Sequence, residues 1–173
     1  MTHNLTKRAA LFALDAHYNQ RRKYTRQQYF SHCMAVARLV EDHGGTEEMI
    51  AAAYLHDVVE DTQYTLRDIL HHFGSEIAGL VQSLTDVSRP EDGNRAIRKS
   101  IDRAHIAAAS EDAKTIKLAD LIDNAKSIAA HDPDFARVYM REKRLLLDFL
   151  RDGNHDLWLM ADKIVSDYEK ANA

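Results

Sequence analysis

Cysteine, glycine and proline are all scarce in this chain of 173 residues. Cys33 is the single cysteine, so no disulfide can form within the chain, and we expect a protein of the reducing cytoplasm. Only 6 glycines and 2 prolines interrupt the backbone, which favours long helices. The sequence has no apolar run of about 18 residues and its N-terminus has no signal-peptide core, so we expect no association with a membrane.

An excess of positive charge is also lacking. The formal net charge is -4, so the chain as a whole is not expected to bind nucleic acid. An anionic substrate would therefore need a local basic patch. Hydrophobic residues make up 45% of the chain and charged residues 29%, a balance that predicts one domain over residues 1–173 with a substantial core. The oligomeric state is not predicted by these properties.

Helical periodicity is present along most of the chain. Thr46 and Ser75 are expected to cap helices, Thr65 and Asp68 form a capping-box pattern, and Asp132 precedes a proline that suits the first helical turn. No segment convincingly predicts a strand. The sequence therefore predicts an all-α, compact bundle of roughly eight helices. The expected helices cover about 6–20, 28–42, 47 through the acidic segment near 60, 66–73, 75–85, 95–109, 112–130, 133–151 and 155–170.

The dipeptide His-Asp occurs three times, whereas random order would give about one occurrence. His131-Asp132 and His155-Asp156 lie at expected helix starts, where an aspartate commonly serves as a cap. His56-Asp57 follows four residues with mostly apolar side chains and is expected in the middle of a helix. Aspartate is unfavourable there without a partner. A metal ion would pair with both side chains at once.

Glu60 and Asp61 follow one helical turn after the His56-Asp57 pair. Residues four apart share a helix face, so these four polar groups are expected on the same side. This spacing indicates a hydrolytic metal site, in which the second pair handles a water molecule. The alternative is a solvated acidic helix end with an incidental histidine.

Two more residues are candidates to complete a metal site. His32 lies in an expected apolar helix, and Asp120 follows the apolar segment 115–119. Taken alone, His32 could be a core histidine and Asp120 a surface acid. Two imidazoles and two carboxylates would suit Mn²⁺, with Fe²⁺ or Zn²⁺ as alternatives.

These motifs resemble the HD-domain metal-dependent phosphohydrolases, and within them the hydrolase domain of Rel/SpoT enzymes and the small Mesh-type alarmone hydrolases. The resemblance covers about 9–148. Its most specific parts are the run from Leu55 to Thr62, which contains His56-Asp57-x-x-Glu60-Asp61, and Lys117-Leu-Ala-Asp120-x-x-x-Asn124. The resemblance implies an HD-domain helical fold and hydrolysis of guanosine 3′,5′-bis(diphosphate), or its pentaphosphate form, to GDP or GTP and pyrophosphate.

The resemblance also assigns roles to individual residues. Glu60 and Asp61 match the pair that orients and activates the attacking water. The implied metal ligands, usually for Mn²⁺, are His32, His56, Asp57 and Asp120. The implied substrate contacts are Arg22, Lys23, Asn124 and Ser127, and the candidate phosphate contacts are Arg98 and Lys99, whose alternative is a solvated helix face.

The sequence departs from the family pattern near the expected base pocket. The loop Tyr24–Gln28 differs from the family's Gly-Thr-Pro-Tyr type, Cys33 stands where a proline is common, and Leu121 stands where a basic residue is common. These departures leave a second enzymatic reading open: hydrolysis of an adenosine alarmone, of the NADPH 2′-phosphate or of an ordinary nucleotide. A third reading is a helical nucleotide-binding module without turnover, although such a module would not need Glu60 and Asp61.

Overall fold

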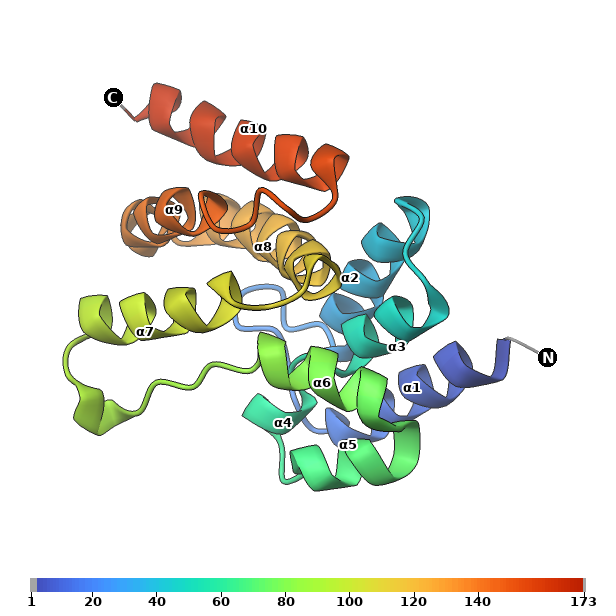
Figure 1. Cartoon of the computed structure of the whole chain (residues 1–173). Coiled ribbons are helices and arrows are strands. Elements are labelled where there is room, and N and C mark those ends of the chain that lie inside the picture. Colours follow the sequence, from blue (N-terminus) through green and yellow to red (C-terminus); the bar gives the residue numbers. More distant parts are fainter. Residues whose placement is uncertain (1–2, 173) are drawn as a thin grey trace. The chain divides into compact units, whose positions relative to one another are not determined.

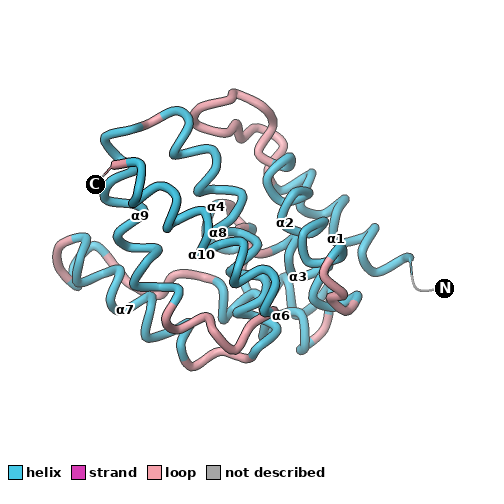
Figure 2. The backbone as a smooth tube through the Cα atoms, turned by 90° about the horizontal axis from the view of Figure 1, so that it is seen from above, coloured by secondary structure: helices cyan, strands magenta, loops and turns pink. Residues whose placement is uncertain are grey.

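Two units make up the chain, one over Met1–Thr85 and the other over Asp86–Ala173. The structure is a computed structural model that describes residues 3–172. Figure 2 shows helices joined by loops throughout the described residues. The described part contains ten α-helices and one short 3₁₀ helix, so the predicted all-α fold is confirmed. The single domain over residues 1–173 stays a prediction.

The first unit is built around helix α3 (Glu47–Leu55). Helix α3 is apolar around most of its circumference, because α1, α2 and α6 all pack against it. Figure 1 shows this arrangement within the first unit. The other helices of this unit are α1 (His3–Ala16), α2 (Phe30–Asp42), α4 (Val58–Asp61), α5 (Leu66–Phe73) and α6 (Ser75–Leu84).

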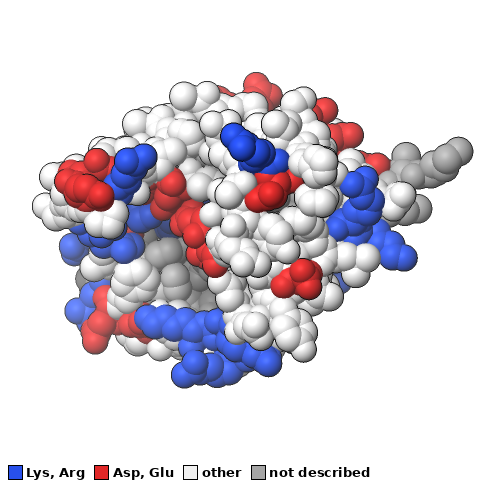
Figure 3. Space-filling model, turned by 90° about the horizontal axis from the view of Figure 1, so that it is seen from below, with Lys and Arg blue, Asp and Glu red and all other residues white. Residues whose placement is uncertain are grey.

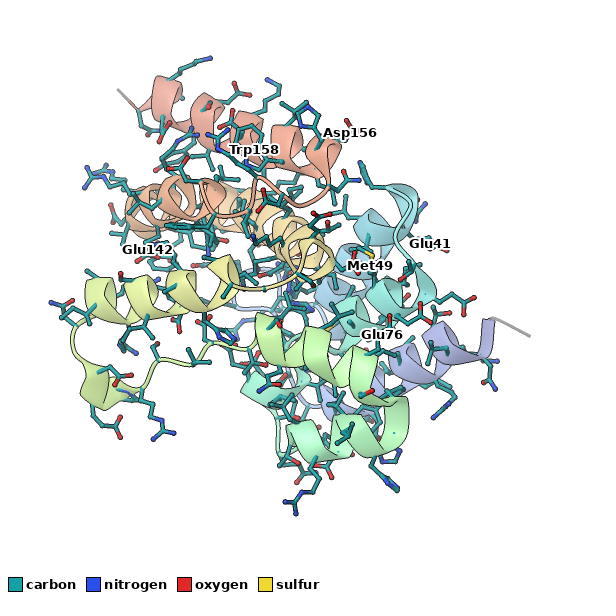
Figure 4. The ribbon with its side chains drawn as sticks, viewed as in Figure 1. Glu41, Met49, Glu76, Glu142, Asp156 and Trp158 are labelled. Carbon is teal, nitrogen blue, oxygen red and sulfur yellow. The ribbon has the colours of Figure 1, made fainter. Side chains whose placement is uncertain are left out.

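The second unit is built from three long helices that pack against one another, α8 (Glu111–His131), α9 (Pro133–Leu147) and α10 (His155–Ala171). The turn between α9 and α10 passes close to α8, where a Cβ at Gly153 would lie 3.1 Å from the Lys114 backbone. In Figure 4, Trp158 of α10 is labelled; its indole nitrogen donates to the Leu147 carbonyl at the end of α9, 2.9 Å away. The 3₁₀ helix η1 (Pro90–Asp92) and α7 (Arg95–Ala107) complete this unit.

The predicted caps are confirmed at three positions. Thr46 accepts from the Met49 amide, Thr65 and Asp68 form the reciprocal capping box, and Asp132 accepts from the Phe135 amide. The prediction for Ser75 was wrong, because Gly74 is the N-cap of α6 and adopts a φ of 87°, which favours glycine.

The number of helices is larger than predicted, because one expected helix is interrupted. The expected helix from residue 47 is divided into α3 and α4, and His56 and Asp57 lie in the turn between them. The prediction of a mid-helix pair was therefore wrong. The break is slight, since the Asp61 amide still bonds to the Asp57 carbonyl at 2.9 Å. The spacing of one helical turn between the two acidic segments is thus retained.

Charged side chains of both signs share the surface. On the face drawn in Figure 3, Lys and Arg side chains lie next to Asp and Glu side chains. Some neighbours are successive turns of one helix, such as Lys163 and Asp167, whose charged atoms are 2.7 Å apart. Among the described residues, no helix is both long and apolar enough to span a membrane.

Candidate active site

Three metal-ligating side chains converge in the first unit. His32 comes from the first turn of α2, and His56 and Asp57 come from the turn between α3 and α4. The two Nε2 atoms lie 3.3 Å apart, and they lie 3.5 Å (His32) and 3.0 Å (His56) from Asp57 Oδ2. A divalent ion held at about 2.0–2.2 Å by each donor would set neighbouring donors roughly 3 Å apart. The observed spacing therefore fits one bound metal ion.

Burial strengthens the case for a cation at this cluster. The side chains of His32 and His56 are 1% and 2% exposed, so water cannot satisfy their ring nitrogens. His56 Nδ1 donates to the Ala53 carbonyl at 2.7 Å, which leaves the lone pair of Nε2 directed at the cluster. Two imidazoles and a carboxylate form a mixed nitrogen and oxygen set, which suits Mn²⁺, Fe²⁺ or Zn²⁺.

Tyr29 supports the cluster, although the sequence did not assign it a role. Its hydroxyl donates to Asp57 Oδ2 at 2.6 Å, and its ring packs on His32 with 5.6 Å between the ring centres. Tyr29 precedes His32 by three residues, which is one helical turn. That spacing was the sequence signal from which a supporting residue could have been found.

The two acidic residues of α4 follow the cluster directly. Asp61 is connected to the loop before α2, because Gln20 Nε2 donates to the Asp61 carbonyl at 2.7 Å. Asp61 is exposed, but loss of solvent around its carboxyl group and then the charge of Asp57 raise its pKa above the ordinary value. The place of Asp61 one turn after the proposed metal donors suits it to the role of a base, which stays a prediction. Glu60 is exposed on the same short helix.

The basic pair Arg22-Lys23 lies in a tight turn of the first unit. The turn is closed by an antiparallel bridge between Arg21 and Gln28 and by the Arg22 amide, which donates to Gln27 at 2.9 Å. Lys23 Nζ lies 3.1 Å from the Tyr24 hydroxyl and 4.8 Å from the centre of its ring. The structure thus gives a defined shape to this loop, whose sequence differs from the family pattern. Its contact with a substrate base stays a prediction.

Asp120 lies in the second unit, on α8, and is 7% exposed. Lys117 Nζ is 3.0 Å from Asp120 Oδ2, and Asn124 donates to Oδ1 at 2.7 Å. These contacts fix the orientation of the carboxylate. Its role as the fourth metal ligand, and the role of Asn124 at the nucleoside, stay predictions.

The remaining predicted substrate contacts also lie in the second unit. Arg98 and Lys99 are half-buried on α7, and Ser127 is half-buried on α8. Within the described residues, Arg98 Nε is buried and has no hydrogen-bond partner, and its contact with a substrate phosphate stays a prediction. Lys99 Nζ, in contrast, lies 2.6 Å from Asp86.

Comparison with known proteins places this geometry in a family. The family model described as the HD domain matches residues 9–146 of this chain. The chain belongs to the HD domain family. In that family the chain resembles a probable guanosine-3′,5′-bis(diphosphate) 3′-pyrophosphohydrolase of Synechocystis, with 39% identity over 82% of this chain and 19% of the relative. The chain thus spans about a fifth of that relative's length.

Two shorter relatives of this HD-domain chain match over most of their length. The MESH1 guanosine-3′,5′-bis(diphosphate) 3′-pyrophosphohydrolase of Drosophila melanogaster is 34% identical over 88% of both chains. A solved structure of a metazoan SpoT ortholog described as hydrolysing ppGpp matches with a TM-score of 0.85 and 31% identity, over 95% of both chains. The predicted family resemblance is therefore confirmed.

Proposed function

We propose that this HD-domain protein hydrolyses guanosine 3′,5′-bis(diphosphate), and its pentaphosphate form, to GDP or GTP and pyrophosphate. The observation that carries the proposal is the cluster of His32, His56 and Asp57 with an acidic pair one turn later. The similarity to guanosine-3′,5′-bis(diphosphate) 3′-pyrophosphohydrolases supports the choice of substrate. Manganese as the resident metal and a cytoplasmic location belong to the same proposal.

The chemistry assigns a role to each part of the first unit. A bound divalent ion would polarise a phosphoryl oxygen and lower the pKa of a coordinated water toward about 7. His32, His56 and Asp57 would hold that ion, and the family resemblance adds Asp120 as the fourth ligand. Asp61, with Glu60 beside it, accepts the proton as the water oxygen bonds to the phosphorus next to the ribose 3′ oxygen. The bond from that phosphorus to the 3′ oxygen breaks, and the 3′ oxygen gains a proton.

The direct test is product analysis with purified protein and guanosine tetraphosphate. We expect pyrophosphate and GDP in equal amounts, restored by Mn²⁺ after the protein has been treated with a chelator. Hydrolysis of other nucleotides under the same conditions, with the alarmone left intact, would overturn the proposed substrate.

A second candidate substrate class comes from the turn between Arg21 and Gln28. Lys23 is held against Tyr24 in this turn, and Arg26 has a φ of 58°, so the expected base pocket has its own shape. That shape favours testing an adenosine alarmone, NADPH and ordinary nucleotides beside the guanosine alarmone. Release of orthophosphate from NADPH, with the alarmones and ordinary nucleotides left intact, would identify the NADPH 2′-phosphate class.

A further inference from the structure

His17 is a buried histidine of the first unit that the proposed mechanism does not use. It directly follows α1 and is 1% exposed. Its amide donates to the Ala13 carbonyl at 3.0 Å, so the residue continues the last turn of the helix. His17 therefore lies where α1 ends and the loop toward α2 begins.

The side chain of His17 is connected to the acidic pair of α4 through Gln20. Gln20 Nε2 donates to the Asp61 carbonyl at 2.7 Å, so Gln20 Oε1 is the acceptor to which His17 Nδ1 donates. The Gln20 carbonyl accepts from the Tyr29 amide at 3.0 Å, which closes the base of the loop 21–28. His17 thus holds a residue that bonds both to α4 and to the residue before α2.

His17 is connected to the metal cluster through Tyr29. The two rings pack against each other with 4.8 Å between their centres. The Tyr29 hydroxyl donates to Asp57 Oδ2 at 2.6 Å, so the orientation of the Tyr29 ring sets the direction of this hydrogen bond. His17 therefore contacts both the residue that supports a proposed metal donor and the residue that holds the proposed base.

The surroundings of His17 are not those that stability alone would select. Because Nδ1 carries the proton, Nε2 presents a lone pair, and this atom is buried without a hydrogen-bond partner among the described residues. A buried acceptor without a partner costs free energy, whereas an apolar ring of similar shape does not. A side chain that is unfavourable for the fold in this way is typical of a functional site.

We infer that His17 is a positioning residue, which acts through Gln20 and Tyr29 to keep the acidic pair of α4 in place beside the metal cluster. The inference rests on the proposed function, because it takes Asp61 as the base and Asp57 as a metal donor. A base works only within hydrogen-bonding distance of the attacking water, so a small displacement of α4 lowers the rate. His17 itself transfers no proton.

His17→Phe keeps a ring against Tyr29 and removes the donor to Gln20. At saturating Mn²⁺ we expect kcat for guanosine tetraphosphate to fall about tenfold. Tm should change by less than about 3 °C, because the unpartnered nitrogen is removed as well. His17→Asn supplies an amide donor in place of Nδ1 and should keep kcat within about threefold of the unchanged protein. His17→Leu gives the same test if His17→Phe does not fold.

Phe12→Leu is the matched control for a change in the packing of α1. Phe12 packs its ring on Tyr64 and Phe73, with 4.6 and 5.4 Å between ring centres. This variant should lower Tm at least as much as His17→Phe does and leave kcat unchanged. A loss of kcat in both variants would make the effect of His17 a general effect of packing and would overturn the inference.

A double-mutant cycle tests whether His17 acts through Gln20. Gln20→Leu alone should lower kcat as much as His17→Phe does, and the double variant should be no slower than either, because all three lose the same connection. Effects that multiply in the double variant would show that the two residues act independently, which contradicts the inference.

Mn²⁺ affinity, measured by calorimetry, requires no turnover. His17→Ala removes the ring that packs on Tyr29 and should weaken Mn²⁺ binding about tenfold. Unchanged Mn²⁺ affinity in His17→Ala, or unchanged kcat in His17→Phe, overturns the positioning role. If His17→Ala weakens Mn²⁺ binding but the unchanged protein leaves guanosine tetraphosphate intact, the positioning role stands and the proposed substrate fails.

Discussion

His56-Asp57 and His131-Asp132 have the same two side chains in different surroundings. His56 is 2% exposed, and its Nε2 lies 3.0 Å from the Asp57 carboxylate, beside a second buried imidazole. His131 is exposed at the end of α8, and Asp132 caps α9 by accepting from the Phe135 amide at 3.2 Å. In the second pair the backbone satisfies the carboxylate. In the first pair two ring nitrogens and a carboxylate oxygen face one another, an arrangement that suits a bound cation.

The largest expected difference between the two pairs is in activity. Asp57→Asn removes an anionic metal donor, so we expect metal binding and hydrolysis to be abolished. Asp132→Asn keeps a good helix cap and should leave both unchanged. Metal content and pyrophosphate release, measured on both variants, check this contrast. Equal activity of the two variants would remove the distinction between the pairs.

The acidic pair of α4 sharpens the comparison, because the capping pair His131-Asp132 has no neighbour with a proposed catalytic role. Replacing Glu60 by Gln and Asp61 by Asn together should lower kcat about 10²–10⁴-fold, the usual range for loss of general base catalysis. Metal content should stay at the level of the unchanged protein, since neither residue belongs to the metal cluster. Loss of the metal in this double variant would instead make the pair part of the metal site.

Removing the Tyr29 hydroxyl should affect metal binding at the first His-Asp pair less than removing the Asp57 carboxylate does. Tyr29→Phe removes the hydroxyl that donates to Asp57 at 2.6 Å and keeps the ring that packs on His32. Supporting residues of this kind typically contribute about 10–100-fold to metal affinity or activity. A metal titration followed by activity measures the effect. An unchanged metal affinity would show that Asp57 does not depend on this hydrogen bond.

Asp102 extends the comparison to a buried carboxylate with a structural role. Its oxygens accept from the Val87 and Ser88 amides at 3.1 and 2.9 Å and from the Ser88 hydroxyl, and Lys99 lies 3.5 Å away. Burial alone would raise the pKa of Asp102, but the Ser88 hydrogen bonds and the Lys99 charge outweigh it and lower this pKa.

The lowered pKa of Asp102 has a defined consequence for stability. The ionised group stabilises the fold above its unfolded pKa, near 3.8, and this contribution is lost as the pH falls through the folded value. We expect Asp102→Asn to be less stable at pH 6 and to lose less free energy of unfolding than the unchanged protein between pH 6 and pH 3. Urea unfolding at several pH values checks this, and parallel pH curves for the two proteins would contradict it.

The smallest expected effect concerns the cap itself. Asp132→Ala should lower the free energy of unfolding by about 1 kcal/mol, the usual cost of losing an N-cap, and should leave hydrolysis unchanged. Thermal melting and an activity assay are sufficient. A large loss of activity would mean that the second His-Asp pair does more than cap a helix.

The sequence predicted the helices better than their breaks. Apolar spacing and caps such as Thr46 and Asp132 are local signals, so the all-α fold and most helix boundaries followed from them. The turn at His56-Asp57 depends on what packs around α3, which local periodicity does not record. Gly74 replaced Ser75 as a cap because its positive φ is set by the connection between α5 and α6.

Of the predicted site residues, three lie together in the structure, and the roles of all of them stay predictions. The resemblance to the HD-domain family implied that His32 joins His56 and Asp57, and the three side chains do meet in the first unit. Tyr29 precedes His32 by three residues, but its hydrogen bond to Asp57 depends on contact between the start of α2 and the turn after α3, which sequence spacing does not record.

The central claim is that the cluster around Asp57 holds a metal ion that the protein uses to release pyrophosphate. The most direct measurement is metal-dependent pyrophosphate release from guanosine tetraphosphate, with Asp57→Asn and Asp132→Asn assayed in parallel. We predict that Mn²⁺ restores release in the chelator-treated unchanged protein and in Asp132→Asn, and that Asp57→Asn stays inactive. Release of pyrophosphate by Asp57→Asn at the rate of the unchanged protein would contradict the account.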